Sequence, residues 1–112
     1  MSEQLVKLYV RRTEAQRDVT SFPDWRDGSR CGVRFRYTSV LDRWYMWLID
    51  LDGSTIAGPK KLVPGRDLLL GDKHDPRVPP GQLFVYSPDR LPPTAATVDV
   101  AAVLYYRRVE SS

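Results

Sequence analysis

Three small groups of side chains have the residue types that catalysis or metal binding uses. Asp50 and Asp52 stand two positions apart just before a glycine, a spacing found in calcium loops, and paired carboxylates also serve glycosidases. His74 beside Asp75 has the pairing of a general base. Cys31 is the only cysteine, and a thiol can act as a nucleophile or a metal ligand. Each group lacks most of the partners that its chemistry needs.

A structural interpretation is therefore favoured for each group. Asp-x-Asp-Gly is mainly a turn sequence, because short polar side chains and glycine suit a chain reversal. The one histidine is expected in a solvated loop, and one cysteine with one histidine falls short of a structural zinc set. For Cys31 we expect a buried or half-buried structural thiol, while an iron–sulfur ligand shared between subunits stays open. We expect no enzyme, no cofactor and no metal.

Arginines and aromatics alternate in Val33-Arg-Phe-Arg-Tyr37, a pattern that suggests a small β-barrel that binds nucleic acid. Such barrels need stacking aromatics on the exposed face, beside the cations. On a strand, Phe35 and Tyr37 point away from Arg34 and Arg36, so the aromatics are expected in the core. The arginines then pair with acids across strands or between subunits. A nucleic-acid-binding β-barrel is kept as the alternative function.

Composition limits the class of protein further. The chain has 112 residues, 13 arginines against four lysines, and a net charge of only +3. We expect one β-rich domain over residues 1–112. Arginine is favoured over lysine at interfaces, and a nucleic-acid binder usually has a larger charge excess. The first residues lack the pattern of a signal peptide and no apolar run could cross a bilayer, so we expect cytoplasmic synthesis and no membrane partner.

Alternating hydrophobic residues between turn signals predict an all-β fold. The expected class is a small antiparallel β-barrel or sandwich of six to seven short strands. Nine prolines argue against long helices. Strands are expected at 5–12, 32–40, 44–51, 54–63, 83–86 and 97–108, with a weaker strand at 16–20 and a short extended piece at 66–70.

Two of these strands carry more specific expectations. The 44–51 strand is apolar on both faces, with Trp44 and Trp47 on opposite sides, which is typical of a strand covered on both faces. Proline within 54–63 predicts a bulge or an unpaired edge. In 97–108 one face is expected to hold a row of apolar side chains: Val98, Val100, Ala102, Leu104 and Tyr106.

An ordered set of short motifs carries a family resemblance. It comprises Arg43-Trp44-Tyr45, Leu48, Asp50 to Gly53, Ile56-Ala-Gly58, Leu62-Val-Pro-Gly65-Arg-Asp-Leu-Leu69, Pro80-Gly81-Gln-Leu83-Phe-Val85 and Val103-Leu-Tyr-Tyr106. This set resembles the baseplate plug family of contractile-tailed phages, which includes the plug of a cyanophage. The family-like core covers about 32–106, and 1–31 is an N-terminal strand plus loop.

The resemblance implies a small β-rich structural protein of the virion with no known catalytic role. Its place would be the baseplate at the distal end of the tail, after synthesis in the host cytoplasm. Its partners would be other baseplate and tail proteins (hub, tail tube, wedge or spike), with multiple copies in a symmetric assembly. Loop or end position and residue type favour six partner contacts: Arg11, Arg12, Phe22, Trp25, Arg77 and Arg107.

Overall fold

The computed structural model describes residues 5–10, 17–26 and 28–108. The described residues form strands, turns and irregular segments, and none of them is helical. It follows that the described part contains no helix long and apolar enough to cross a membrane. Within these ranges there are seven strands: β1 (Leu5–Leu8), β2 (Asp18–Ser21), β3 (Gly32–Thr38), β4 (Arg43–Ile49), β5 (Thr55–Lys61), β6 (Gln82–Tyr86) and β7 (Val103–Arg107). The expected all-β class is confirmed.

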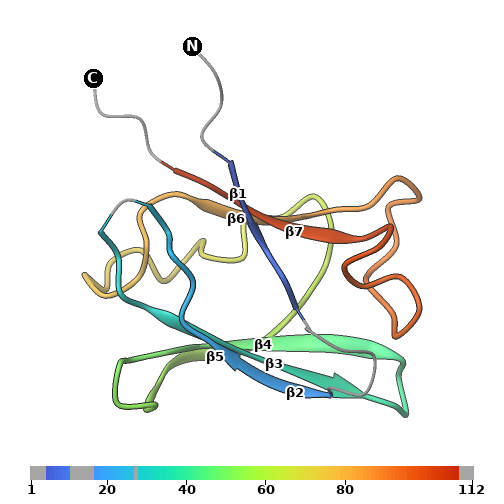
Figure 1. Cartoon of the computed structure of the whole chain (residues 1–112), viewed down its shortest axis with the longest axis horizontal. Coiled ribbons are helices and arrows are strands. Elements are labelled where there is room, and N and C mark those ends of the chain that lie inside the picture. Colours follow the sequence, from blue (N-terminus) through green and yellow to red (C-terminus); the bar gives the residue numbers. More distant parts are fainter. Residues whose placement is uncertain (1–4, 11–16, 27, 109–112) are drawn as a thin grey trace.

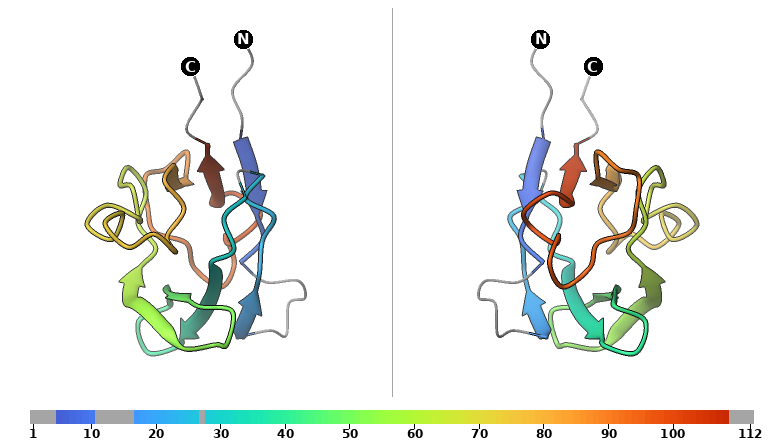
Figure 2. Two further views of the ribbon diagram at one scale, coloured as in Figure 1. Left: turned by 90° about the vertical axis from the view of Figure 1, so that its left-hand side faces the viewer. Right: turned by 90° about the vertical axis from the view of Figure 1, so that its right-hand side faces the viewer.

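The strands form two antiparallel sheets that lie face to face (Figure 1). The three-stranded sheet has the order β1-β7-β6, and the four-stranded sheet has the order β2-β3-β4-β5. The two sheets are also seen as separate layers in both side views of Figure 2. The arrangement is a sandwich, because the named strands of one sheet do not pair with those of the other to close a barrel.

The β3–β4 hairpin is the centre of the four-stranded sheet. Its register pairs Phe35 with Met46 and Val33 with Leu48, and all four side chains are buried. Since directly opposite residues share one face of a sheet, the positions between them point outward. The alternation within 32–40 therefore predicted the inner face of this strand correctly.

The β4–β5 connection is a tight turn built on a glycine. The Asp50 N–H donates to the carbonyl of Ser54 over 2.8 Å, and the Gly53 N–H donates to the carbonyl of Asp50 over 2.9 Å. Gly53 has φ +87, a left-handed conformation that costs glycine nothing. β5 is an edge strand with register shifts against β4, which agrees with the bulge or unpaired edge predicted for 54–63. Its Gly58–Pro59 bond is cis.

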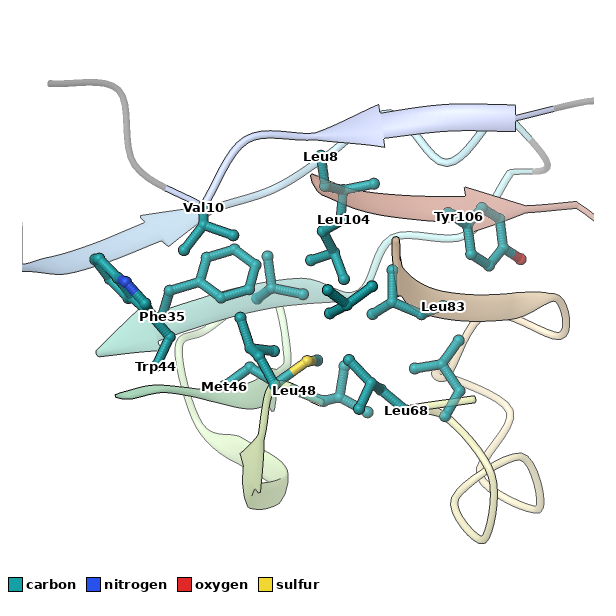
Figure 3. Close-up of a cluster of buried hydrophobic side chains, with 14 of the residues drawn as sticks. Leu8, Val10, Phe35, Trp44, Met46, Leu48, Leu68, Leu83, Leu104 and Tyr106 are labelled. Atoms are coloured by element: carbon teal, nitrogen blue, oxygen red, sulfur yellow. The ribbon is translucent and has the colours of Figure 1, made fainter. Parts of the chain in front are cut away.

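Side chains from both sheets meet in one hydrophobic core (Figure 3). Leu8, Leu83, Leu104 and Tyr106 come from the three-stranded sheet. They face the inner residues of β3 and β4, and Leu68 from the chain between the sheets completes the cluster. The two layers are thus joined by apolar burial, which is the main favourable term in folding.

The chain between β5 and β6 protects the free edge of β6. Pro64 forms a bridge to Val85, and the Leu68 N–H donates to the carbonyl of Leu83 over 2.7 Å. The Leu83 N–H donates in turn to the Asp67 carboxylate over 3.1 Å. Residues 66–70 form turns rather than the expected extended piece. Their hydrogen bonds satisfy backbone groups of β6 that could otherwise pair with another strand.

Two expected strands are shorter than the pattern indicated. β1 ends at Leu8, because the Val10 N–H donates to the Asp99 carboxylate over 2.9 Å instead of joining a ladder. Residues 97–101 turn back on themselves: the N–H groups of Val100 and Ala101 both donate to the carbonyl of Thr97. Val100 is consequently 77% exposed, and the expected placement of Val100 in the buried row is wrong.

Candidate partner-contact surface

The four described residues among the six expected partner contacts do not lie together. Arg11 and Arg12 fall outside the described residues. Phe22 and Arg107 are exposed on the outer sides of different sheets, and Arg77 lies in the loop before β6. These four residues therefore do not mark one surface, and the expected contacts remain a prediction.

Trp25 is a core residue. It is fully buried, and its indole N–H donates to the carbonyl of Cys31 over 2.8 Å. The ring also packs edge-on against Tyr106, with ring centroids 4.8 Å apart. Because the Trp25 side chain is fully covered by the rest of the chain, it has no exposed surface to contribute to a contact with a partner.

Phe22 lies on the outside of the four-stranded sheet. It is 51% exposed and covers Gly32, where an added Cβ would come 2.6 Å from the Phe22 ring and 2.8 Å from Ile49. The glycine therefore provides the space that brings the ring down onto the sheet. This exposed ring is one part of a larger outer face.

The register of β3 and β4 places cations beside aromatics on that outer face. Arg34 pairs with Trp47, and Arg36 pairs with Tyr45, which pairs in turn with Lys61 of β5. The Arg34 guanidinium lies 5.8 Å from the centre of the Trp47 ring, within range of a cation–π contact. We call this surface the cation–aromatic face; it consists of Phe22, Arg34, Arg36, Tyr45, Trp47 and Lys61.

The cation–aromatic face corrects two expectations. Trp47 is only half-buried while Trp44 is fully buried, so β4 is covered completely on one side alone. The aromatics beside Arg34 and Arg36 come from the neighbouring strand and not from their own strand. A signal for this was present in the sequence, because positions 45 and 47 alternate with the buried positions of β4, but strand pairing was needed to use it.

Asp18 holds one of the cations in place. Its two carboxylate oxygens accept hydrogen bonds from Arg34 over 3.2 and 3.0 Å. This contact lowers the pKa of Asp18, so the pair is fully ionised at neutral pH. Both side chains are exposed, which makes the ion pair worth little for folding but fixes the direction of the guanidinium.

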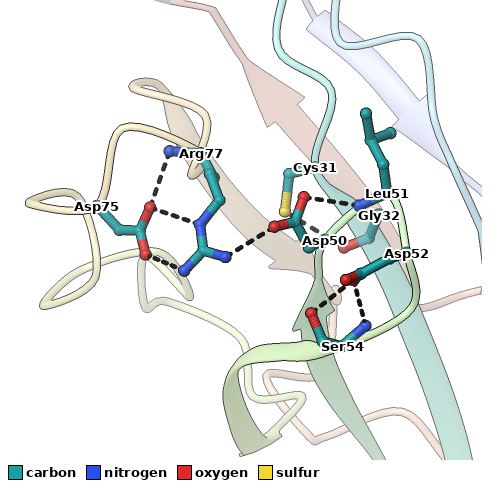
Figure 4. Close-up of polar contacts among 8 residues, drawn as sticks. All are labelled: Cys31, Gly32, Asp50, Leu51, Asp52, Ser54, Asp75 and Arg77. Carbon is teal, nitrogen blue, oxygen red and sulfur yellow. Dashed lines mark hydrogen bonds and ion pairs between the residues drawn. The ribbon is translucent and has the colours of Figure 1, made fainter.

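Arg77 joins two loops through two carboxylates (Figure 4). It donates to Asp50 over 2.7 Å and forms a two-pronged contact with Asp75 over 3.0 and 2.8 Å. These hydrogen bonds lower the pKa of Asp50 and bring the pKa of Asp75 to about 2. A general acid needs a raised pKa, whereas these contacts lower the pKa of both carboxylates.

The other candidates for chemistry have structural surroundings. Asp52 accepts hydrogen bonds from the Ser54 N–H over 2.9 Å and from its hydroxyl over 2.6 Å, which confirms the turn (Figure 4). The buried Cys31 thiol donates to the Gly32 carbonyl over 3.3 Å, and burial raises its pKa to about 11. His74 is exposed. In the described ranges no three potential metal ligands gather.

Fold and surface together define a small all-β sandwich protein with an outer sheet face rich in arginine and aromatic residues, the types enriched at protein interfaces. The family model described as cyanophage baseplate Pam3 plug gp18 matches residues 13–109, and the chain belongs to this baseplate plug family. The match is wider than the 32–106 region of the resemblance. Comparison with curated proteins finds no match. Membership supports a structural role in a phage baseplate and implies contacts with other baseplate or tail proteins.

Proposed function

We propose that this chain is a plug-type structural component of a contractile-tail baseplate that acts by protein–protein contacts in tail assembly. Its neighbours are the hub, the tail tube, and wedge or spike proteins at the distal end of the virion tail, in multiple symmetric copies. Family membership supports the location, and the cation–aromatic face is the observation that supports the mechanism.

The cation–aromatic face is suited to contact because its side chains are already ordered. An added Cβ at Gly58 would lie 2.8 Å from Trp47, so the indole rests directly on β5. Arg34 is fixed by Asp18 on one side and lies over the indole on the other. Preordered arginines and aromatics lose little conformational entropy on binding, which is why such residues dominate binding energy.

No catalytic step is part of this proposal. The carboxylates of Asp50, Asp52 and Asp75 are used to hold turns and loops together. If the chain were instead a cell-wall hydrolase, these side chains or His74 would carry the reaction. We expect Asp50→Asn and His74→Ala proteins to behave as wild type in a lysis assay.

The proposal can be tested in a phage whose growth depends on this gene. Particles carrying Arg34→Glu with Arg36→Glu should assemble tails poorly, because charge reversal at an interface costs several kcal/mol against the native partner. The control is Arg30→Glu, an exposed arginine in the β2–β3 connection. Tail assembly and infectious titre are measured for both variants, and cryo-microscopy locates the protein in wild-type particles.

The expected result is density at the distal end of the tail, with loss of titre in the double variant alone. Complete tails of full infectivity from which the protein is missing would contradict the structural role. Normal assembly by the double variant would contradict the use of the cation–aromatic face, while leaving the location intact.

Single-stranded nucleic acid is a second candidate partner, because the face does bring exposed cations beside aromatics. Against it, the Trp47 ring is already in contact with Gly58 and Arg34, which leaves little free surface for base stacking. Binding of an oligothymidylate that weakens steeply with salt would favour this candidate. We expect no such binding at physiological salt.

A further inference from the structure

A groove of about 630 Å³ lies along β6 on the three-stranded sheet, away from the cation–aromatic face. Its walls include the 64–67 turn, and its lining takes in alternate residues of β6, among them the half-buried Phe84 and the 57% exposed Tyr86. Arginines from three separate parts of the chain reach it: Arg66, Arg90 and Arg107. A volume of this size is in the range of ligand-binding clefts.

The charge in this groove is unbalanced. Its three arginines are exposed, and among the residues that the structure describes the one carboxylate in the lining, that of Asp67, already has partners. Asp67 forms an ion pair with Lys73 over 2.7 Å and accepts the N–H groups of Leu69 and Leu83 over 3.0 and 3.1 Å. Arg66 and Arg90 therefore leave the described lining with a positive charge that an anionic partner would neutralise.

Aromatic rings give the groove a partly apolar wall. Phe84 packs against Tyr105 with ring centroids 6.1 Å apart, and the Arg107 guanidinium lies 5.6 Å from the centre of the Phe84 ring. The guanidinium is thus held against the aromatic wall of the groove. The ring also limits the rotamers of Arg107, which reduces the entropy lost on binding.

We propose that this groove binds a short, extended, acidic segment of another baseplate protein. β6 has five residues, so the groove accommodates roughly 17 Å of extended chain at about 3.3 Å per residue. Carboxylates of the segment pair with Arg66 and Arg90, and apolar side chains between them contact Phe84 and Tyr86. The segment adds contacts on the outer side of the sheet, since the edge of β6 is already bonded to residues 64–68.

Polypeptide fits the groove better than nucleic acid does. Stacking of bases needs open ring faces, and Phe84 is already contacted by Arg107 and Tyr105, which leaves only Tyr86 widely exposed. A second copy of this chain fits poorly too, because the chain has a net charge of +3. The inference rests on the proposed function only for the identity of the partner class.

The test uses the full-length protein and a labelled hexapeptide of alternating glutamate and leucine, with fluorescence anisotropy as the readout. Wild type should bind the peptide, and its glutamine analogue should not bind. Arg66→Gln with Arg90→Gln should weaken binding roughly tenfold, since charge-assisted contacts are among the strong ones. The control, Arg26→Gln with Arg30→Gln, makes the same change of charge in the β2–β3 connection and should keep wild-type affinity.

Four results would overturn the inference: no peptide binding by wild type, equal binding of the glutamine analogue, equal loss in the control, or self-association through the groove arginines. Tighter binding of an oligothymidylate, lost in the same groove variant, would assign the groove to nucleic acid instead. The peptide titration measures binding to the groove in the isolated protein, whereas cryo-microscopy density in the virion tests the proposed function. Failure of one is thus distinguishable from failure of the other.

Discussion

Arg77 shows what one exposed side chain contributes in this protein. It bridges the β4–β5 turn and the 71–81 loop by contacting Asp50 and Asp75 together. Sequence position alone favoured Arg77 as a partner contact, and the two carboxylates do not exclude this, since the side chain remains 47% exposed. Its internal role can be measured directly.

The Arg77→Gln protein should show raised pKa values for Asp50 and Asp75. Both values are depressed in the native protein, that of Asp75 to about 2 against an ordinary 3.8. A depressed folded-state pKa adds stability above the ordinary value, and this contribution is lost as the pH falls from 3.8 toward 2. The variant should therefore lose less stability over that acid range, as followed by carboxyl ¹³C NMR and thermal unfolding.

A matched control is Arg34→Gln, which should raise the pKa of Asp18 and leave Asp50 and Asp75 unchanged. If Asp75 titrates identically in wild type and Arg77→Gln, the contact does not exist in solution.

The two tryptophans of β4 should differ in their effect on stability. Trp44 is fully buried, and Trp44→Ala should cost ~3–5 kcal/mol of unfolding free energy because a large cavity opens in the core. Trp47 is half-buried on the outer face, so Trp47→Ala should cost clearly less. Urea unfolding of both variants measures the difference, and equal midpoints would show that β4 is in the wrong register.

At the scale of the element, the start of β6 depends on a glycine that has no room for a side chain. Gly81 donates its N–H to the Tyr106 hydroxyl over 2.9 Å, and an added Cβ would lie 2.1 Å from the carbonyl oxygen of Arg107. Gly81→Ala should push β6 away from β7 and cost about 3 kcal/mol, the upper end of overpacking effects. Thermal or urea unfolding measures the loss.

Gly53→Ala is the control for this prediction. Gly53 has φ +87 but no atom within 4 Å of an added Cβ, so only the left-handed backbone opposes alanine, at about 1–2 kcal/mol. A Gly81→Ala protein as stable as Gly53→Ala would mean that β6 and β7 are spaced more widely than described.

Strand prediction succeeded where side-chain alternation acted alone and failed where polar side chains competed for the backbone. Residues 32–38 alternate cleanly and form β3 as expected. Residues 97–101 also alternate, but the Thr94 and Thr97 hydroxyls engage nearby N–H groups and turn the chain. Side chains that form hydrogen bonds with the local backbone compete with the pairing of strands. The alternation of hydrophobic residues carries no information about these hydrogen bonds.

At the scale of the whole molecule, the shared core should make both sheets unfold together. Leu104 of β7 is buried among residues of both layers, and Leu104→Ala should cost ~2–5 kcal/mol. Amide hydrogen exchange should then speed up alike in β3, β4, β6 and β7, as expected of one domain. The control, Leu41→Ala, changes a 58% exposed side chain in the β3–β4 turn and should leave exchange unaltered.

Wild-type protection of β3 and β4 in the Leu104→Ala protein would indicate two independent units instead. That outcome would contradict our proposal of a single domain over residues 1–112.

Sequence by itself determined the all-β class, the positions of most strands, the 50–53 turn and the family, because alternation, turn residues and ordered motifs are local properties of the chain. Tertiary structure alone decided which surfaces exist. Trp47 lies beside Arg34 only because β3 and β4 pair in one register, and Arg66 and Arg90 line one groove only because the chain folds back along β6. Register and long-range contact join residues far apart in the chain, so one-dimensional pattern cannot fix them.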